Sequence, residues 1–144
     1  MYAQRQDMED VFGLKEVITL TDRNRQGEID DVVLRKALAR ASSEIDSYIG
    51  SRYTLPLSAD IIPEALVDRC CDITRFKLCG TSGVQLTEEI RARYEDAVRY
   101  LEQIASGKIK LGTGEIGTAK TTNTVKFASG GRQFGRDKTN GGAF

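Results

Sequence analysis

The residues most able to do chemistry in this sequence form a polar run at positions 22–30. Asp22, Asn24 and Gly27 stand at positions one, three and six of the pattern typical of an EF-hand calcium loop. Calcium takes six to eight oxygen ligands in such loops, and a glutamate at position twelve supplies two of them. A calcium site at residues 22–33 therefore requires oxygen ligands at the remaining positions of the loop, including position twelve.

That ligand set is incomplete. Gln26 occupies position five and Val33 occupies position twelve, and two arginines add positive charge inside the loop. We instead predict a tight polar turn, in which Gly27 adopts a left-handed conformation and Asp30 caps the next helix. The residues of the look-alike, from which we predict no metal site, are Asp22, Asn24, Gln26 and Glu28.

Other groups with catalytic potential are sparse. The chain has no histidine, which removes the commonest general base and the commonest metal ligand. Cys70, Cys71 and Cys79 give neither a disulfide framework nor a C-x-x-C spacing, and we expect the first two to pack in a helix core. Carboxylate pairs such as Glu88 and Glu89 fall on predicted solvent faces. These patterns predict a protein that is not an enzyme and binds no cofactor.

The elements that hold these residues are predicted to be helices. Two short helices cover about residues 4–12 and 14–20, with Gly13 between them as a cap. The second short helix is expected to turn four apolar side chains inward, namely Leu14, Val17, Ile18 and Leu20.

Three longer helices are predicted from apolar residues that recur at three- and four-residue steps. The first follows Asp30 and fades near Tyr53, where an extended linker begins. The second ends at a glycine cap, Gly80, and is apolar on so much of its circumference that we expect it to be the central helix. Thr87 caps the third, which ends at Gly107. The fold class is all-α, a small helical bundle over residues 1–107.

The charge of the chain is unevenly distributed. The 144 residues carry 21 basic and 21 acidic side chains, so the formal net charge is zero. Residues 106–144 hold seven basic and two acidic residues, a net charge of +5, which leaves −5 on the first 105. The same tail holds nine of the fourteen glycines. We therefore divide the chain into an acidic helical body, residues 1–107, and an extended, basic, Gly-rich C-terminal arm, residues 108–144.

The chain shows no membrane or export pattern. No apolar run approaches the roughly 20 residues that a spanning helix needs. The first residues lack the basic and then apolar pattern of a signal peptide, so we expect no export.

The order of several landmarks makes the chain similar to a family of tailed-phage proteins. The most distinctive are the segment Arg-Tyr-x-Leu-Pro-Leu at residues 52–57 and the Ala-Ser-Gly-Lys end of the last helix at 105–108. Together with the Met-Tyr-Ala start and the run Cys-Asp-Ile-Thr-Arg-Phe at 71–76, they span about residues 1–111. This order resembles the small neck proteins of Mu-like phages and prophages, which in turn look like the head-to-tail adaptors of long-tailed phages.

The resemblance implies a structural role with specific partners. Such adaptors form a homo-oligomeric ring, typically dodecameric, beneath the portal protein, and offer a docking surface to head-closure or tail-completion proteins. The ring extends the channel for packaged DNA, which passes without sequence-specific binding. The resemblance implies a location at the virion neck, the head-tail junction, after assembly in the host cytoplasm.

The arm is expected to bind a neighbouring subunit or the portal. Its basic side chains would pair with an acidic surface while its phenylalanines serve as apolar anchors. Residues 122–127 have a strand-like composition, and a short β-strand there can add to a partner sheet. The alternative is a solvated, flexible tail. The residues we predict to bind a partner are Lys120, Val125, Lys126, Phe127, Arg132, Phe134, Arg136, Lys138 and Phe144.

Two further interpretations stay open. The acidic body suits the wall of a DNA channel, because negative side chains repel the duplex, although acidic residues also simply solvate helices. A different function class is a helical nucleic-acid-binding module that uses the basic tail to follow phosphates. The acidic body disfavours this module.

Overall fold

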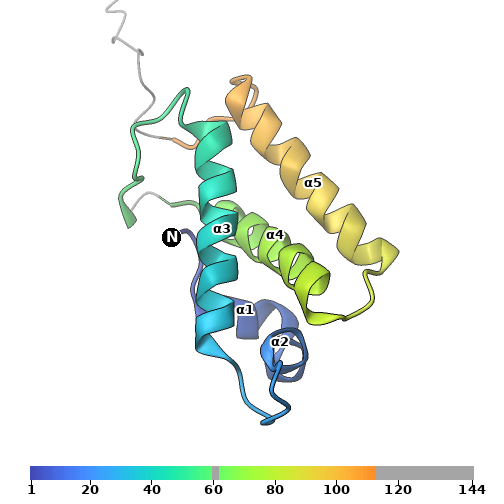
Figure 1. Ribbon diagram of the computed structural model, residues 1–144. Coiled ribbons are helices and arrows are strands. Elements are labelled where there is room, and N and C mark those ends of the chain that lie inside the picture. The colour runs from blue at the N-terminus through green and yellow to red at the C-terminus, as the bar shows by residue number, and fades with distance from the viewer. Residues whose placement is uncertain (60–61, 113–144) are drawn as a thin grey trace, which may run out of the picture.

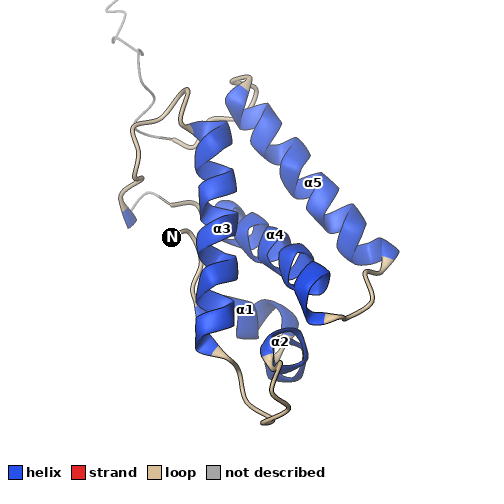
Figure 2. Ribbon diagram, viewed as in Figure 1, coloured by secondary structure: helices blue, strands red, loops and turns tan. Residues whose placement is uncertain are grey.

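The computed structural model describes residues 1–59 and 62–112, and within these ranges the chain folds into five α-helices (Figure 1). The two short helices lie together at one end of the molecule, and no β-strand is present in the described part (Figure 2). This confirms the all-α fold class. The helices are α1 (Arg5–Phe12), α2 (Leu14–Thr21), α3 (Asp31–Ile49), α4 (Glu64–Ser82) and α5 (Glu88–Ala105).

The helix starts follow the predicted capping residues. The Asp30 carboxylate accepts hydrogen bonds from the backbone N–H groups of Val32 and Val33, at 2.9 and 3.0 Å. The Thr87 hydroxyl accepts one from the N–H of Ile90, at 3.3 Å. These side chains satisfy backbone donors that have no partner within the helix, so they fix where α3 and α5 begin.

The predicted end of α4 is wrong by three residues. Gly80 lies inside the helix, which continues to Ser82 and ends at Gly83 with φ 75°. A left-handed C-cap favours glycine because other residues meet a steric penalty there. Both Gly80 and Gly83 fit the rule that a helix commonly ends at a glycine, and the helix ends at Gly83, which adopts the left-handed conformation.

Helix α4 is the centre of the bundle, as its wide apolar surface predicts. It packs against each of the other four helices. Several of its side chains are fully buried, among them Leu66, Cys70, Cys71 and Ile73. The same core cluster includes Ile45 and Ile49 of α3 and Leu101 and Ile104 of α5, also fully buried.

One residue expected inside lies outside. Leu14 is 51% exposed, whereas Val17 and Leu20 of the same helix are buried and Ile18 is partly buried. Leu14 is the first residue of α2, and an eight-residue helix buries only one narrow face.

The linker after α3 is held to the end of the described chain. Tyr53 is buried, and its hydroxyl accepts a hydrogen bond from the backbone N–H of Leu111 at 2.9 Å. The peptide bond between Leu55 and Pro56 is cis. Ile109 and Leu111 pack against the core, so residues that the sequence division places in the arm contact the body. The rest of the arm, including the expected strand at residues 122–127, lies outside the described residues.

None of the helices in the described ranges is long and apolar enough to cross a membrane.

We predict that Ile73→Ala destabilises the body by about 2–4 kcal/mol, since Ile73 is fully buried in the central helix and the substitution leaves a cavity. Urea unfolding followed by circular dichroism measures the change. Val32→Ala is the matched control, because Val32 is 58% exposed, and it should change stability by no more than about 0.5 kcal/mol. Equal effects of the two substitutions would contradict the assigned core.

Candidate partner-binding surfaces

The calcium-loop look-alike is a self-contained turn. The Asp22 carboxylate accepts hydrogen bonds from the backbone N–H groups of Gln26 at 3.0 Å and Gly27 at 2.7 Å. These amides lower the pKa of Asp22. Gly27 has φ 77°, which confirms the left-handed position. Both carboxylate oxygens of Asp22 thus serve the turn itself, while Asn24 and Glu28 are exposed.

The three cysteines pack in the core, as predicted for Cys70 and Cys71. All three are buried and free. Burial raises the pKa of each thiol, because a thiolate loses its hydration there. A protonated, inaccessible thiol is a poor nucleophile.

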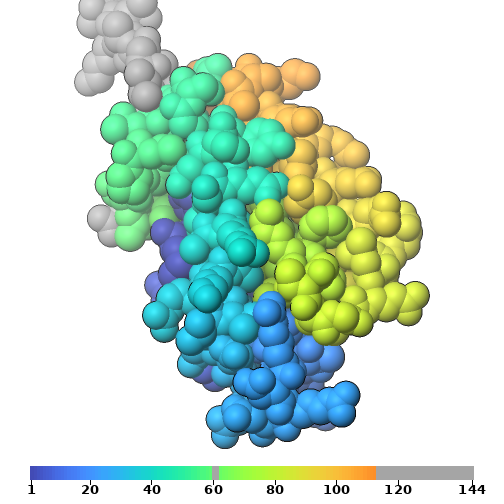
Figure 3. Space-filling view, in the orientation of Figure 1, coloured from blue at the N-terminus to red at the C-terminus, as the bar shows by residue number. Residues whose placement is uncertain are grey.

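A basic recess lies between α3 and the last turns of α4, beside the loop that follows α2. Figure 3 shows α3 and this part of α4 side by side on the face turned to the viewer. It encloses about 320 Å³. Its floor is apolar, formed by Val33, Ala37 and Leu78. The basic recess is lined by Arg23, Val33, Lys36, Ala37, Arg40, Lys77, Leu78 and Thr81.

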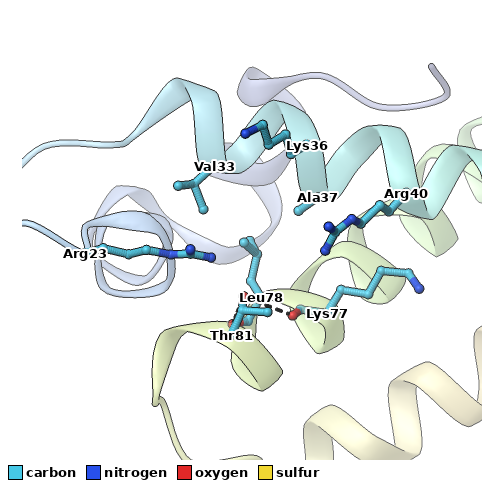
Figure 4. Close-up of a pocket in the computed structure, with 8 residues that line it drawn as sticks. All are labelled: Arg23, Val33, Lys36, Ala37, Arg40, Lys77, Leu78 and Thr81. Atoms are coloured by element: carbon cyan, nitrogen blue, oxygen red, sulfur yellow. Dashed lines mark hydrogen bonds between the residues drawn. The ribbon is translucent and has the colours of Figure 1, made fainter.

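The cations of the basic recess come from three segments. Arg23 enters from the loop after α2 and Arg40 from α3, and both guanidinium groups point toward Leu78 (Figure 4). The ammonium group of Lys77 extends away from Leu78, and Lys77 forms an ion pair with Glu44. The two arginines thus place positive charge over an apolar floor.

An acidic groove lies at the other end of α4, where its first turns meet α1. The groove encloses about 370 Å³. Four carboxylates and three apolar side chains line it, so it has the opposite charge to the basic recess and a similar apolar component. The acidic groove consists of Asp7, Asp10, Val11, Ile62, Glu64, Val67 and Asp68.

Except for Lys77, the charged side chains of both surfaces form no ion pair within the described chain. Asp7 accepts a hydrogen bond from the N–H of Gln4, and Asp10 from the amide of Gln6. Yet none of the ion pairs found among residues 1–59 and 62–112 involves a carboxylate of the acidic groove. The same ion pairs include neither Arg23, Lys36 nor Arg40 of the basic recess. Unpaired charge of opposite sign at two sites suits binding to charged partners.

A different set of charges is paired inside the bundle. The Asp72 carboxylate of α4, whose side chain is 2% exposed, lies 3.0 Å from Arg93 Nε of α5 and 3.4 Å from an Arg69 nitrogen. Arg75 Nε lies 2.6 Å from Glu16 Oε1 of α2. These pairs join α4 to α2 and α5, so they hold helices in place.

The same network reaches α1 through an aromatic ring. The guanidinium of Arg75 lies 4.7 Å from the centre of the Phe12 ring, and that of Arg93 lies 5.6 Å from it. Such cation–π contacts are attractive, and more so when partly desolvated. Phe12 therefore fixes the end of α1 on the charges of α4 and α5.

Sequence reasoning missed both surfaces. The basic recess combines Arg23 with side chains from two distant helices, and the acidic groove joins α1 to α4. The available signal was local: Lys36 and Arg40 are four residues apart on α3, and Glu64 and Asp68 are four apart on α4. All nine residues predicted to bind a partner, from Lys120 to Phe144, lie outside the described residues, so that prediction stays untested.

Comparison with known proteins adds the decisive observation. A family model described as Bacteriophage Mu, Gp36 matches residues 2–129. The chain belongs to the phage Mu Gp36 family. This confirms the resemblance to Mu-like phage proteins, and the match extends through the body into residues of the arm.

Two relatives show how far the similarity reaches. The chain is 34% identical over 142 residues to the Mu-like prophage FluMu protein gp36 of Haemophilus influenzae, covering 98% of this chain and 97% of that one. It is 41% identical over 90 residues to gene product J of Escherichia phage Mu, covering 62% of this chain and 60% of that one. The Haemophilus relative matches nearly end to end, so this member of the Gp36 family has the body and the arm in common with it.

We predict that Asp72→Asn changes how stability depends on pH. Burial raises the pKa of Asp72 against the lowering effect of Arg93 and Arg69, so the folded protein binds a proton there more readily than the unfolded chain. This contribution to stability is present at low pH and is lost as pH rises through the raised pKa. The asparagine variant lacks this contribution. The free energy of unfolding of the wild type should therefore rise relative to that of the variant as the pH falls from neutral to about 3.

Urea unfolding at several pH values measures this difference. Asp96→Asn is the matched control, since Asp96 forms an exposed pair with Arg99 and such pairs contribute little. A loss of about 3–5 kcal/mol for Asp72→Asn at neutral pH, the cost typical of a broken buried pair, would show that attraction to Arg93 outweighs burial.

Proposed function

We propose that this protein is a structural head-to-tail adaptor of a tailed phage or prophage. Copies of it form a ring under the portal, extend the DNA channel and dock a head-closure or tail-completion protein at the virion neck. Membership in the Gp36 family of phage Mu carries the proposal. The described body supports it with two surfaces of opposite charge on a small bundle, most of whose charged side chains form no ion pair in the described chain. Such surfaces suit a protein that works by contacting neighbours.

The body has the construction of a rigid spacer. Helix α4 contacts all four other helices, and Asp72, Arg75 and Phe12 join α1, α2, α4 and α5 through ion pairs and cation–π contacts. A body fixed in this way holds its outer surfaces at constant relative positions. Constant geometry is what a ring of identical subunits requires, because each subunit must present the same angle to the next.

The arm supplies the second element of the proposal. Residues 113–144 carry Lys120, Lys126, Arg132, Arg136 and Lys138, against Glu115 and Asp137. A fully extended segment of this length reaches about 100 Å at roughly 3.3 Å per residue. In the proposed ring, the arm contacts the portal or an adjacent subunit through its basic and phenylalanine side chains.

The second candidate function is nucleic-acid binding, and the arginines of the basic recess are the observation that favours it. Arg23 and Arg40 point toward one cavity without a carboxylate partner in the described chain, and phosphate oxygens pair well with arginine. The acidic groove and the net charge of −5 on the first 105 residues weigh against close approach of a duplex. We favour the adaptor.

Deleting residues 113–144 should abolish docking to the portal protein of the same phage and leave the body folded. The core residues of the described ranges lie at or before Leu111, and all five helices end before residue 106, so the helical circular-dichroism signal per molecule should persist. Negative-stain electron microscopy of portal mixed with full-length or shortened chain measures ring formation. Undiminished decoration of the portal by the shortened chain would refute the role given to the arm, and no decoration by the full chain would refute the adaptor itself.

Binding to bare DNA separates the two candidate functions. For the adaptor, a fluorescently labelled duplex of random sequence should show little binding at physiological salt. For the nucleic-acid module, tight binding should weaken by roughly 10³-fold or more as salt rises from about 50 to 200 mM. Arg23→Gln/Arg40→Gln tests whether any binding observed belongs to the basic recess.

A further inference from the structure

The loop between α2 and α3 projects from the end of the molecule beyond the helices that it joins (Figure 1). Residues 23–28 of the loop are all exposed. Arg23 and Arg25 extend from it, and neither forms an ion pair within the described chain. Asp22 holds the loop through the amides of Gln26 and Gly27, and Arg25 has φ 56°. The loop is therefore a fixed projection beside the basic recess, and its exposed residues 23–28 carry two arginines against one carboxylate, Glu28.

The acidic groove is the concave counterpart on the same chain. Glu64 and Asp68 are exposed and have no cationic partner among the described residues. Val11 is 38% exposed and lines the groove with Ile62 and Val67. A basic loop that entered this groove would meet carboxylates at hydrogen-bonding range and cover apolar side chains.

The two surfaces are separated within one chain. Lys77 of the basic recess and Glu64 of the acidic groove stand thirteen residues apart on the straight rod of α4, which is about 20 Å at 1.5 Å per residue. The fixed core around α4 keeps them apart. The unpaired charges of one surface therefore meet those of the other only on a second copy.

We propose that the basic α2–α3 loop, with Arg40 and Lys36 of the adjoining recess, docks into the acidic groove of a second copy of this chain. The contact joins two different surfaces, so it is heterologous and leaves each copy with one free basic end and one free groove. Repetition of such a contact closes into a ring or continues as a filament. This inference deepens the proposed function, since it names the surfaces through which the ring would form.

Charge and shape both select this pairing over a symmetric one. Groove against groove would bring four carboxylates from each copy together, and recess against recess would bring together Arg23, Lys36 and Arg40 of each copy, so both are repulsive. Loop against groove matches convex with concave and positive with negative. Long-range attraction accelerates the encounter, and salt weakens it because the groups are exposed.

Disulfide trapping in the full chain tests the contact. One chain carries Asn24→Cys in the loop and another carries Ala65→Cys beside the groove, both at exposed positions that leave the proposed charges intact. The native cysteines are buried, so only the introduced ones should cross-link. In an equimolar mixture under mild oxidation, the mixed disulfide dimer, identified by its mass, should form at least about fivefold faster than random collision allows.

Matched variants make the result specific. Ala92→Cys places the same change at an exposed alanine of α5, away from the groove, and supplies the rate for random collision. Adding Glu64→Gln/Asp68→Asn to the Ala65→Cys chain should slow trapping at least about threefold, as should about 0.5 M salt. Glu95→Gln/Glu102→Gln, which removes two exposed charges of α5, should leave the rate unchanged.

Three outcomes would overturn the proposal. Equal trapping at residues 65 and 92 would show that the loop does not dock in the groove. A trapping rate that Glu64→Gln/Asp68→Asn does not change would show that charge pairing does not hold the contact. Slowing by Lys126→Gln/Arg132→Gln/Arg136→Gln but not by Arg23→Gln/Arg40→Gln would assign the groove to the arm. If any of these occurs while the portal still acquires a ring, the adaptor function survives and only this interface is wrong.

Discussion

The placement of charge on one helix controls the rest of this structure. Helix α4 contacts all four other helices, and it carries Asp72 and Arg75 at buried positions. Ionised groups there are costly unless partners come from neighbouring elements. Arg93 of α5 and Glu16 of α2 are those partners, so these helices can dock on α4 only where the charges meet. Apolar packing gives the bundle its stability, and these pairs restrict the orientation of its helices.

Several charges outside this network have no ionic partner in the described chain. The carboxylates of the acidic groove and the arginines of the basic recess are left without ionic partners in the described chain, although the sequence has equal numbers of acidic and basic residues. Exposed charges cost little to leave unpaired, since water solvates them. Their grouping by sign, however, creates fields that attract an oppositely charged surface and repel a like one. Paired charges thus set the internal geometry of the bundle, and the unpaired charges are available for external contacts.

The sequence predicted the helices well because their signals are local. Capping by Asp30 and Thr87 and the three- and four-residue spacing of apolar side chains are properties of neighbouring residues, and the structure confirms them. The end of α4 was misplaced because two glycines compete and only backbone conformation distinguishes Gly80 from Gly83. The two charged surfaces escaped prediction for a different reason. They join residues about fifty apart, from Asp10 to Glu64 or from Arg23 to Lys77, and only tertiary packing brings these together.

The nature of the exposed surface also bears on when copies associate. The large exposed apolar residues within the described ranges are few and lie on different elements, namely Met1, Val11, Leu14, Val32 and Leu86. An obligate oligomer normally buries a more extensive apolar surface than this. Contacts between copies through the described surface would then depend on exposed charges, which individually contribute about 1 kcal/mol or less. Such contacts are weak in free solution and add up only when many copies are held side by side. In the proposed adaptor, a portal ring that holds them would supply that condition, and a charge-based interface would confine assembly to the portal.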